Sequence, residues 1–155
     1  ELLKYAQTDA LTGLYNKETT EQLTDELLSE DENKSHAFLI LDVDCFKQIN
    51  DIYGHAVGDI VLQKFGKLLK GTFREGDILG RIGGDEFGVI MKNIQTKDIA
   101  MKKAGELLAK TQAYKIDELK GNNISISIGI STAPQDGDCY MDLYKRADQA
   151  LYQAK

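Results

Sequence analysis

Two acidic side chains follow two glycines in the segment RIGGDEFGVI, residues 81–90. Adjacent carboxylates on a tight turn repel each other and bury no apolar surface, and a simple hairpin is better served by Asn-Gly or Asp-Gly. A solvated acidic turn is the ordinary interpretation of Asp85 and Glu86. The alternative is a chemical site, and it depends on which other side chains the fold brings beside these two acids.

Two further acids, Asp42 and Asp44, lie at the end of the apolar run AFLILDV, residues 37–43. A continuous apolar run bounded by polar residues predicts a buried strand. Periodicity and turn residues predict the other elements of the chain. These are helices over 17–29, 57–70, 97–112 and 139–155, a hairpin of strands 77–82 and 86–91, and an alternating strand over 123–132.

This order of elements predicts an α+β domain with a ferredoxin-like βαββαβ core, a central antiparallel sheet and an extra helix at each end. In that topology the second strand of the hairpin runs back beside the first strand of the sheet. The hairpin tip therefore lies next to the carboxyl end of the first strand, and the acids at 42, 44, 85 and 86 converge there. Converging carboxylates favour a hard divalent cation, Mg²⁺ or Mn²⁺. The alternative is two acidic loops that never meet.

Length, charge and cysteine content limit the class of protein. With 155 residues the chain is expected to form a single domain, residues 1–155. Its net charge of −6 argues against nucleic-acid binding. Two cysteines, no apolar run long enough to span a membrane and no signal peptide predict a cytoplasmic domain without direct membrane contact. Because the sequence begins at Glu1, we expect residues 1–8 to be the end of a helix that connects to an upstream region, such as that of a membrane-anchored sensor.

Five blocks of the sequence match a known family in order. They are DALTGLYNK (9–17), DVDCFKQINDIYGHAVGD (42–59), RIGGDEF (81–87), ISISIGIS (124–131) and RADQALYQAK (146–155). Over nearly its whole length the chain resembles the GGDEF domain, the diguanylate cyclase family. The resemblance implies condensation of two GTP molecules into cyclic di-GMP and two pyrophosphates, with one GTP held by each domain of a head-to-head pair. A second, transiently bound copy of the same domain is therefore an expected partner.

The resemblance also implies roles for the acids. Asp42 and Asp85 match the metal-binding positions, assisted by the carbonyl of Val43, and Glu86 is expected to be a further metal contact. Asp85 and Glu86 are the candidate catalytic residues. Asp85 is the candidate for easing the proton off the attacking 3′-hydroxyl.

Substrate-binding positions follow from the same resemblance. The glycines Gly83 and Gly84 lack a Cβ, so the backbone is expected to pass close to the phosphates. The other expected phosphate contacts are the backbone amides around Cys45 and Phe46, the side chain of Lys47, and Lys155 at the γ-phosphate. Asn50 and Asp59 match the guanine-reading pair. An ionised Asp59 accepts from N1–H and the exocyclic amine of guanine, a pattern that adenine lacks, so GTP is expected over ATP. A helix N-terminal acid is the simpler interpretation of Asp59.

The segment REGD gives Arg74 and Asp77 the positions of the family's inhibitory R-x-x-D site for cyclic di-GMP. The arginine that the family usually adds from the following helix has no match here. Two other functions stay open. One is a catalytically silent module that binds GTP or cyclic di-GMP as a regulatory domain. A more distant one is a nucleotide cyclase or polymerase-like relative that acts on another base, which Asp59 disfavours.

Overall fold

The computed structural model describes residues 6–30 and 33–154, and the expected connecting helix at residues 1–8 therefore lies largely outside the described residues. Each predicted helix and strand forms, with its ends shifted by at most a few residues. One short helix follows the first strand directly, where the sequence predicts phosphate contacts. The elements are α2 (Lys17–Glu30), β1 (His36–Val43), α3 (Phe46–Tyr53), α4 (His55–Thr72), β2 (Ile78–Arg81), β3 (Glu86–Met91), α5 (Lys97–Ala113), a 3₁₀ turn (Asp117–Leu119), β4 (Ile126–Ala133) and α6 (Tyr140–Ala154).

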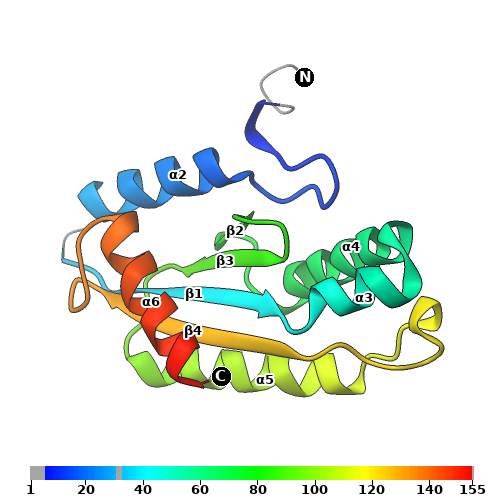
Figure 1. The fold of residues 1–155 in the computed structure, drawn as a ribbon. Coiled ribbons are helices and arrows are strands. Elements are labelled where there is room, and N and C mark those ends of the chain that lie inside the picture. Colours follow the sequence, from blue (N-terminus) through cyan, green and yellow to red (C-terminus); the bar gives the residue numbers. More distant parts are fainter. Residues whose placement is uncertain (1–5, 31–32, 155) are drawn as a thin grey trace.

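The four strands form one sheet in the order β2-β3-β1-β4, and every neighbouring pair is antiparallel (Figure 1). This is the strand order of the ferredoxin-like core, so the predicted fold class is confirmed. The hairpin strand β3 lies between β2 and β1, as the predicted topology requires. The turn between β2 and β3 thus reaches the end of the sheet where β1 terminates.

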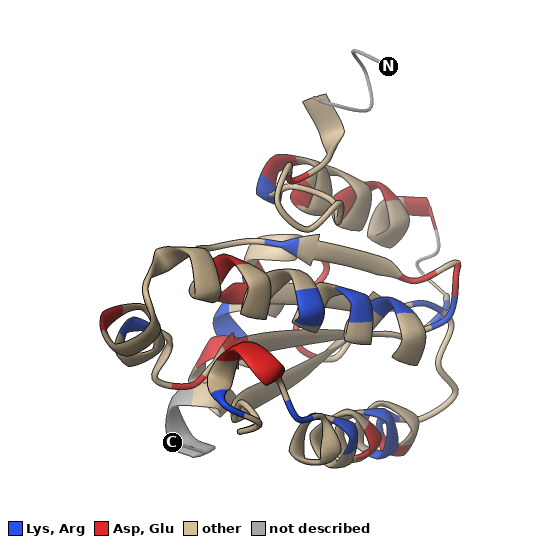
Figure 2. Ribbon diagram, turned by 90° about the vertical axis from the view of Figure 1, so that its right-hand side faces the viewer, with Lys and Arg blue, Asp and Glu red and all other residues tan. Residues whose placement is uncertain are grey.

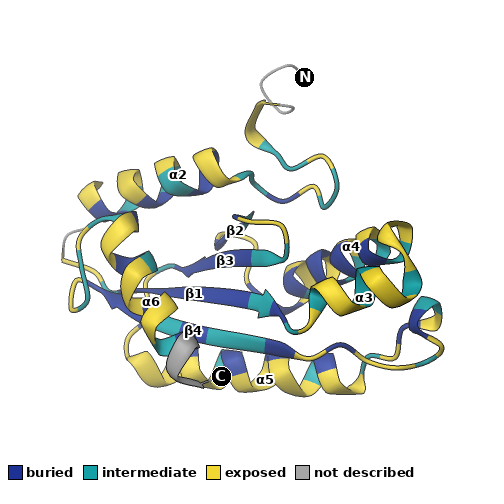
Figure 3. Ribbon diagram, viewed as in Figure 1, coloured by how far each residue is buried: buried dark blue, intermediate teal, exposed yellow. Residues whose placement is uncertain are grey.

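Helices cover both faces of the sheet (Figures 1 and 3). Strand β1 is buried on both sides because Leu39 and Leu41 pack in a core formed with α4 and α5, whereas Phe38 and Ile40 pack in a second core formed with α2 and α6. A strand that is buried on both faces needs apolar residues at successive positions. This explains the continuous apolar run that the sequence shows at 37–41.

The first of the two extra helices, α2, begins as predicted. The side-chain oxygen of Asn16 accepts a hydrogen bond of 2.9 Å from the backbone N–H of Thr19, which is an N-terminal cap. Acids outnumber lysine on α2, where five acids accompany Lys17, whereas α4 and α5 carry more lysines than acids (Figure 2). Among the described residues, none of the helices is long and apolar enough to cross a membrane.

The other extra helix, α6, lies directly against β4 because small residues line that face of the strand. A Cβ on Gly129 would be 2.1 Å from the carbonyl oxygen of Ala147, and the hydroxyl of Ser131 donates to the carbonyl of Leu143 at 2.8 Å. The close approach of α6 explains why serine and glycine alternate with isoleucine along this predicted strand. Strand β4 begins at Ile126 instead of 123.

Replacement of Gly129 by alanine should push α6 away from β4, because the added methyl group would overlap backbone atoms that no side-chain rotation can move. Overpacking of this kind costs about 1–3 kcal/mol. Thermal unfolding followed by circular dichroism measures the loss. Gly105→Ala is the matched control, because that glycine lies in the interior of α5 with open space around it and alanine there should stabilise by about 0.5–1 kcal/mol. Equal melting temperatures for Gly129→Ala and the unmodified chain would contradict the close packing of α6.

Candidate active site

The pairing of β1 with β3 joins the predicted acids across the sheet. Asp42 is the register partner of Glu86, and the backbone N–H of Val43 donates to the carbonyl oxygen of Asp85 at 3.1 Å. Asp42, Asp85 and Glu86 are all half-buried. The two acidic segments therefore meet, and the alternative of two separate acidic loops is wrong.

Hydrogen bonds hold the tip of the hairpin in place. The amides of Ile82 and Gly83 both donate to the carbonyl oxygen of Glu86, at 2.9 and 3.1 Å. The guanidinium of Arg81 donates to the carbonyl oxygen of Gly84 at 2.8 Å and forms an ion pair with Asp9 at 3.2 Å. Arg81 thus orients the turn and ties it to the segment before α2.

The glycines of the turn leave space beside the acids. Neither Gly83 nor Gly84 has a φ in the left-handed region, so backbone conformation does not require glycine at either position. A Cβ on Gly84 would meet nothing within 4 Å. Both glycines are exposed, and the bare backbone therefore presents an open surface that a ligand could approach closely.

Glu86 lies in an acidic and partly desolvated environment. Burial raises the pKa of the Glu86 carboxyl above its ordinary value, and the negative charges of Asp42, Asp148 and Asp85 raise it further. The hydroxyl of Tyr144 on α6 donates to Oε1 of Glu86 at 2.8 Å, which opposes the rise in pKa. Among the described residues, no lysine or arginine forms an ion pair with Asp85 or Glu86. The chemistry of this group of acids therefore suits a bound cation.

Asp44, the other acid at the end of β1, is engaged by β4. Its two carboxylate oxygens accept hydrogen bonds of 2.8 Å from the hydroxyl of Ser125 and 2.6 Å from that of Ser127. Its backbone N–H donates to the carbonyl of Ser125. Both oxygens thus help to fix the end of β1 to the start of β4, which gives Asp44 a structural role.

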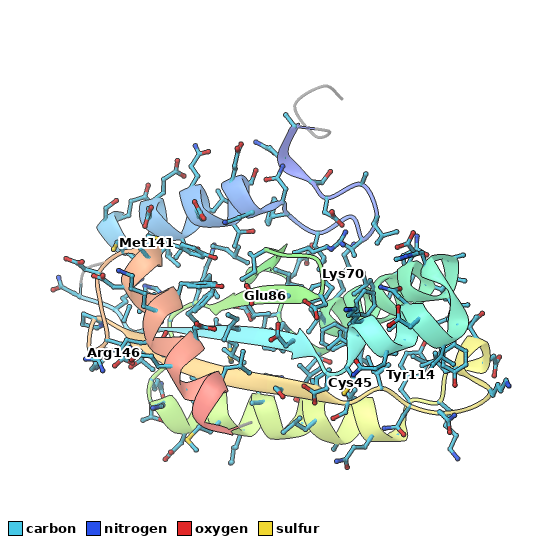
Figure 4. All side chains as sticks on the ribbon, in the orientation of Figure 1. Cys45, Lys70, Glu86, Tyr114, Met141 and Arg146 are labelled. Atoms are coloured by element: carbon cyan, nitrogen blue, oxygen red, sulfur yellow. The ribbon has the colours of Figure 1, made fainter. Side chains whose placement is uncertain are left out.

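The predicted phosphate-binding segment lies immediately after β1. Cys45 is exposed, and its φ of 55° turns the chain into α3. The first backbone amide of this helix to donate within it is that of Ile49, to the carbonyl of Cys45. The amides of the turn that begins at Phe46 come before this bond and have no partner within the helix. Lys47 is exposed in the same turn. Figure 4 shows Cys45 beyond the end of β1 and Glu86 on the neighbouring β3. The amides and Lys47 therefore flank the group of acids.

Asn50, one of the two predicted guanine-reading residues, packs close to Gly58, which directly precedes the other, Asp59. A Cβ on Gly58 would lie 1.9 Å from Oδ1 of Asn50 and 3.2 Å from the ring of Phe46, so only glycine lets these side chains of α3 pack against α4. Asp59 is the next residue and is exposed in the first turns of α4. Asn50 and Asp59 thus lie on the adjoining helices α3 and α4.

Arg74 and Asp77 form a separate structure at the start of β2. Asp77 is buried and accepts from the backbone of Arg74 at 3.2 Å, from its guanidinium at 3.3 Å and from the backbone of Lys92 at 3.1 Å. The Arg74 side chain is 60% exposed and, with Lys70 (labelled in Figure 4), lines a cavity of about 580 Å³. The predicted γ-phosphate contact, Lys155, lies outside the described residues.

A second group of potential metal ligands lies on the opposite end of the sheet from the acids. Among the described residues, Asp138, Cys139 and Asp142 are the group whose ligand atoms all lie within 4.8 Å of one another, at the start of α6. The side chains of Asp42, Asp85 and Glu86 are less tightly gathered. Exposed acids at a helix start are common without a metal, so this second group serves below as a control.

Comparison with known proteins identifies the family. The family model described as "Diguanylate cyclase, GGDEF domain" matches residues 6–155, which is almost the whole chain. The chain belongs to the GGDEF domain family of diguanylate cyclases. The predicted family is therefore confirmed.

Known diguanylate cyclases and GGDEF domains are similar to this chain in sequence and in structure. Diguanylate cyclase A of Treponema denticola is 36% identical in an alignment 162 residues long, which covers 100% of this chain and 43% of that protein, so the chain spans less than half of its relative. The GGDEF domain of TpbB from Pseudomonas aeruginosa superposes with a TM-score of 0.89 at 35% identity over 96% of this chain and 88% of that one. The GGDEF domain of DgcB from Caulobacter crescentus, solved in complex with c-di-GMP, gives a TM-score of 0.87 at 25% identity over 96% and 90% of the two chains.

Three features of this GGDEF domain were missed from sequence. The serines that engage Asp44 had a detectable signal, because 125 and 127 alternate on one strand face. Gly58 also had one, because a glycine inside a helix pattern indicates close packing. Tyr144 had none, because a tyrosine on an amphipathic helix is ordinary core packing, and only the position of α6 directs its hydroxyl to Glu86.

The raised pKa of Glu86 predicts a pH-dependent cost in the metal-free protein. An acid whose pKa is higher in the folded state costs stability as pH rises through that pKa, because the folded protein disfavours the ionised form. Glu86→Gln should therefore raise the melting temperature at about pH 7 in the presence of a chelator. The advantage should shrink as pH falls toward the ordinary carboxyl value of 4.5. Calorimetry at several pH values measures it, and a variant that is less stable at neutral pH would contradict this electrostatic account.

Proposed function

We propose that this GGDEF domain is an active diguanylate cyclase that condenses two GTP molecules into cyclic di-GMP and two pyrophosphates. The observation that carries the proposal is the pairing of β1 with β3, which sets Asp42 opposite Glu86 with Asp85 at the hairpin tip. The intact phosphate-binding turn and the adjoining Asn50 and Asp59 support it.

The group of acids suits a divalent cation, Mg²⁺ or Mn²⁺. Carboxylate and carbonyl oxygens are the ligands that these ions prefer. We assign Asp42, Asp85 and Glu86 as the ligands, with the carbonyl of Val43 as a further one. A bound divalent ion would supply positive charge to the triphosphate and to the attacking hydroxyl.

The neighbouring elements give the nucleotide its orientation. The first amides of α3 and the ammonium group of Lys47 donate to the phosphates, and Gly83 and Gly84 let the hairpin backbone lie under them. The carboxylate of Asp59 accepts from N1–H and the exocyclic amine of guanine, with Asn50 beside it. Adenine offers no such pair of donors, so the substrate is GTP.

The reaction requires two domains. Each 3′-hydroxyl oxygen forms a bond to the α-phosphorus of the other GTP, the bond from that phosphorus to pyrophosphate breaks, and Asp85 accepts the proton of the hydroxyl. One domain holds one GTP, so two copies must face each other across a two-fold axis. Like charges on the two acidic faces favour a transient pair.

The product has a proposed second site at Arg74 and Asp77. Arg74 is exposed next to a cavity, and its guanidinium is held by the buried Asp77, so it is oriented before any ligand arrives. A guanidinium so fixed suits the phosphates and guanine edges of cyclic di-GMP. Binding there would inhibit the enzyme by its own product.

Turnover of GTP tests the proposed activity. The chain incubated with GTP and Mn²⁺ should form cyclic di-GMP, detected by chromatography, and ATP should give no cyclic dinucleotide. Asp85→Ala should lower the rate about 100-fold or more, because it removes the proton acceptor and a metal ligand.

Asp138→Ala is the matched control, because Asp138 is an exposed acid outside the proposed site, and its rate should equal that of the unmodified chain. Because the activity requires a pair of domains, protein is tested over a hundredfold range of concentration. GTP binding without product at every concentration would favour the alternative of a catalytically silent signalling module. Product from Asp85→Ala at the unmodified rate would reject the assignment of the acids.

A further inference from the structure

We propose that Tyr144 is a positioning residue for Glu86: its hydroxyl fixes one carboxylate oxygen and leaves the other available to a divalent cation. The inference rests on the proposed function of the acids at the end of β1. It assigns Tyr144 on α6 a part in the active site that the sequence did not indicate.

The geometry of the contact is specific. The Tyr144 hydroxyl lies 2.8 Å from Oε1 of Glu86, and 58 residues separate the two in the sequence. Among the described residues, no other hydrogen bond or ion pair engages the Glu86 side chain. One oxygen is therefore held by a single donor, and Oε2 remains without a protein donor in the described part of the chain.

The Tyr144 ring is held from several sides. Its centroid is 6.5 Å from that of the fully buried Phe38 and 5.9 Å from that of Tyr140. The helix backbone on either side is fixed to β4, since the Leu143 carbonyl accepts from Ser131 and the Ala147 carbonyl lies against Gly129. The hydroxyl is thus placed by contacts that do not involve Glu86, as a positioning role requires.

A neutral donor orients an acid without neutralising it. A lysine or arginine at this place would hold the carboxylate equally well, but its charge would compete with a divalent cation. Asp44 gives the contrast within the same site, because a serine hydroxyl donates to each of its two oxygens, whereas only one oxygen of Glu86 has a donor among the described residues. The hydroxyl groups on β4 and α6 therefore distinguish the structural acid from the ligand.

The test is the affinity of the protein for Mn²⁺, which the electron paramagnetic resonance signal of the free ion measures. The titration is done in the presence of guanosine 5′-α,β-methylenetriphosphate, a GTP analogue that the enzyme cannot turn over. Tyr144→Phe keeps the ring and removes only the hydroxyl. Loss of a group that orients a metal ligand typically weakens the site 10–100-fold, and we expect a loss of about 10-fold here. The Mn²⁺ concentration for half-maximal turnover of GTP should rise in parallel.

Tyr140→Phe is the matched control. Tyr140 belongs to the same aromatic group, and its buried hydroxyl has no hydrogen-bond partner among the described residues, so its removal should leave Mn²⁺ affinity unchanged. In a Glu86→Gln background, Tyr144→Phe should have no further effect. Circular dichroism verifies that each variant is folded.

A folded Tyr144→Phe variant with unchanged Mn²⁺ affinity would overturn the inference, as would an equal loss in Tyr140→Phe or in the Glu86→Gln background. Failure of the proposed function is distinguishable from this result. If the unmodified chain makes no cyclic di-GMP but its Mn²⁺ affinity depends on Tyr144, the cyclase proposal fails and the positioning role stands.

Discussion

Antiparallel pairing between β1 and β3 is the constraint on which the rest of the site depends. The register sets Asp42 opposite Glu86, and the hydrogen bond from Val43 to Asp85 carries the pairing into the turn. A shift of the register by one residue would turn every side chain of β1 to the other face. The two apolar cores oppose such a shift, because Leu39 and Phe38 would exchange faces. Burial of the sheet thus fixes the position of its acids.

Neutral hydrogen-bond donors hold two of the acids. Serine hydroxyls hold Asp44, a tyrosine hydroxyl holds Glu86, and the hairpin turn is held by backbone amides and by Arg81. The guanidinium of Arg81 at the hairpin is bound to Asp9 and to the carbonyl of Gly84. Among the described residues, Asp85 and Glu86 form no ion pair, so their carboxylates suit the oxygen-ligand site for Mg²⁺ or Mn²⁺ that we propose.

The sequence predicted the convergence of the acids, because the order of elements determines which strand end meets the hairpin. It predicted the start of α2 at residue 17 and the strands from patterns that extend over only a few residues. The contact of Tyr144 with Glu86 could not be predicted in this way. It depends on how α6 is rotated and how closely it lies on β4, and this is decided by contacts of Gly129 and Ser131 with the helix backbone. The identity of the family required the matching blocks, since acids at a sheet edge alone are compatible with several reactions.

The central claim is that a divalent cation binds where β1 and β3 meet. Nuclear magnetic resonance of the ¹⁵N-labelled chain, titrated with substoichiometric Mn²⁺, tests it directly because the paramagnetic ion broadens nearby amide signals. The account predicts that the signals of Val43, Asp85 and Glu86 broaden first, and that those of Asp138 and Asp142 persist. Broadening centred on Asp138 and Asp142, with sharp signals at the hairpin tip, would contradict it.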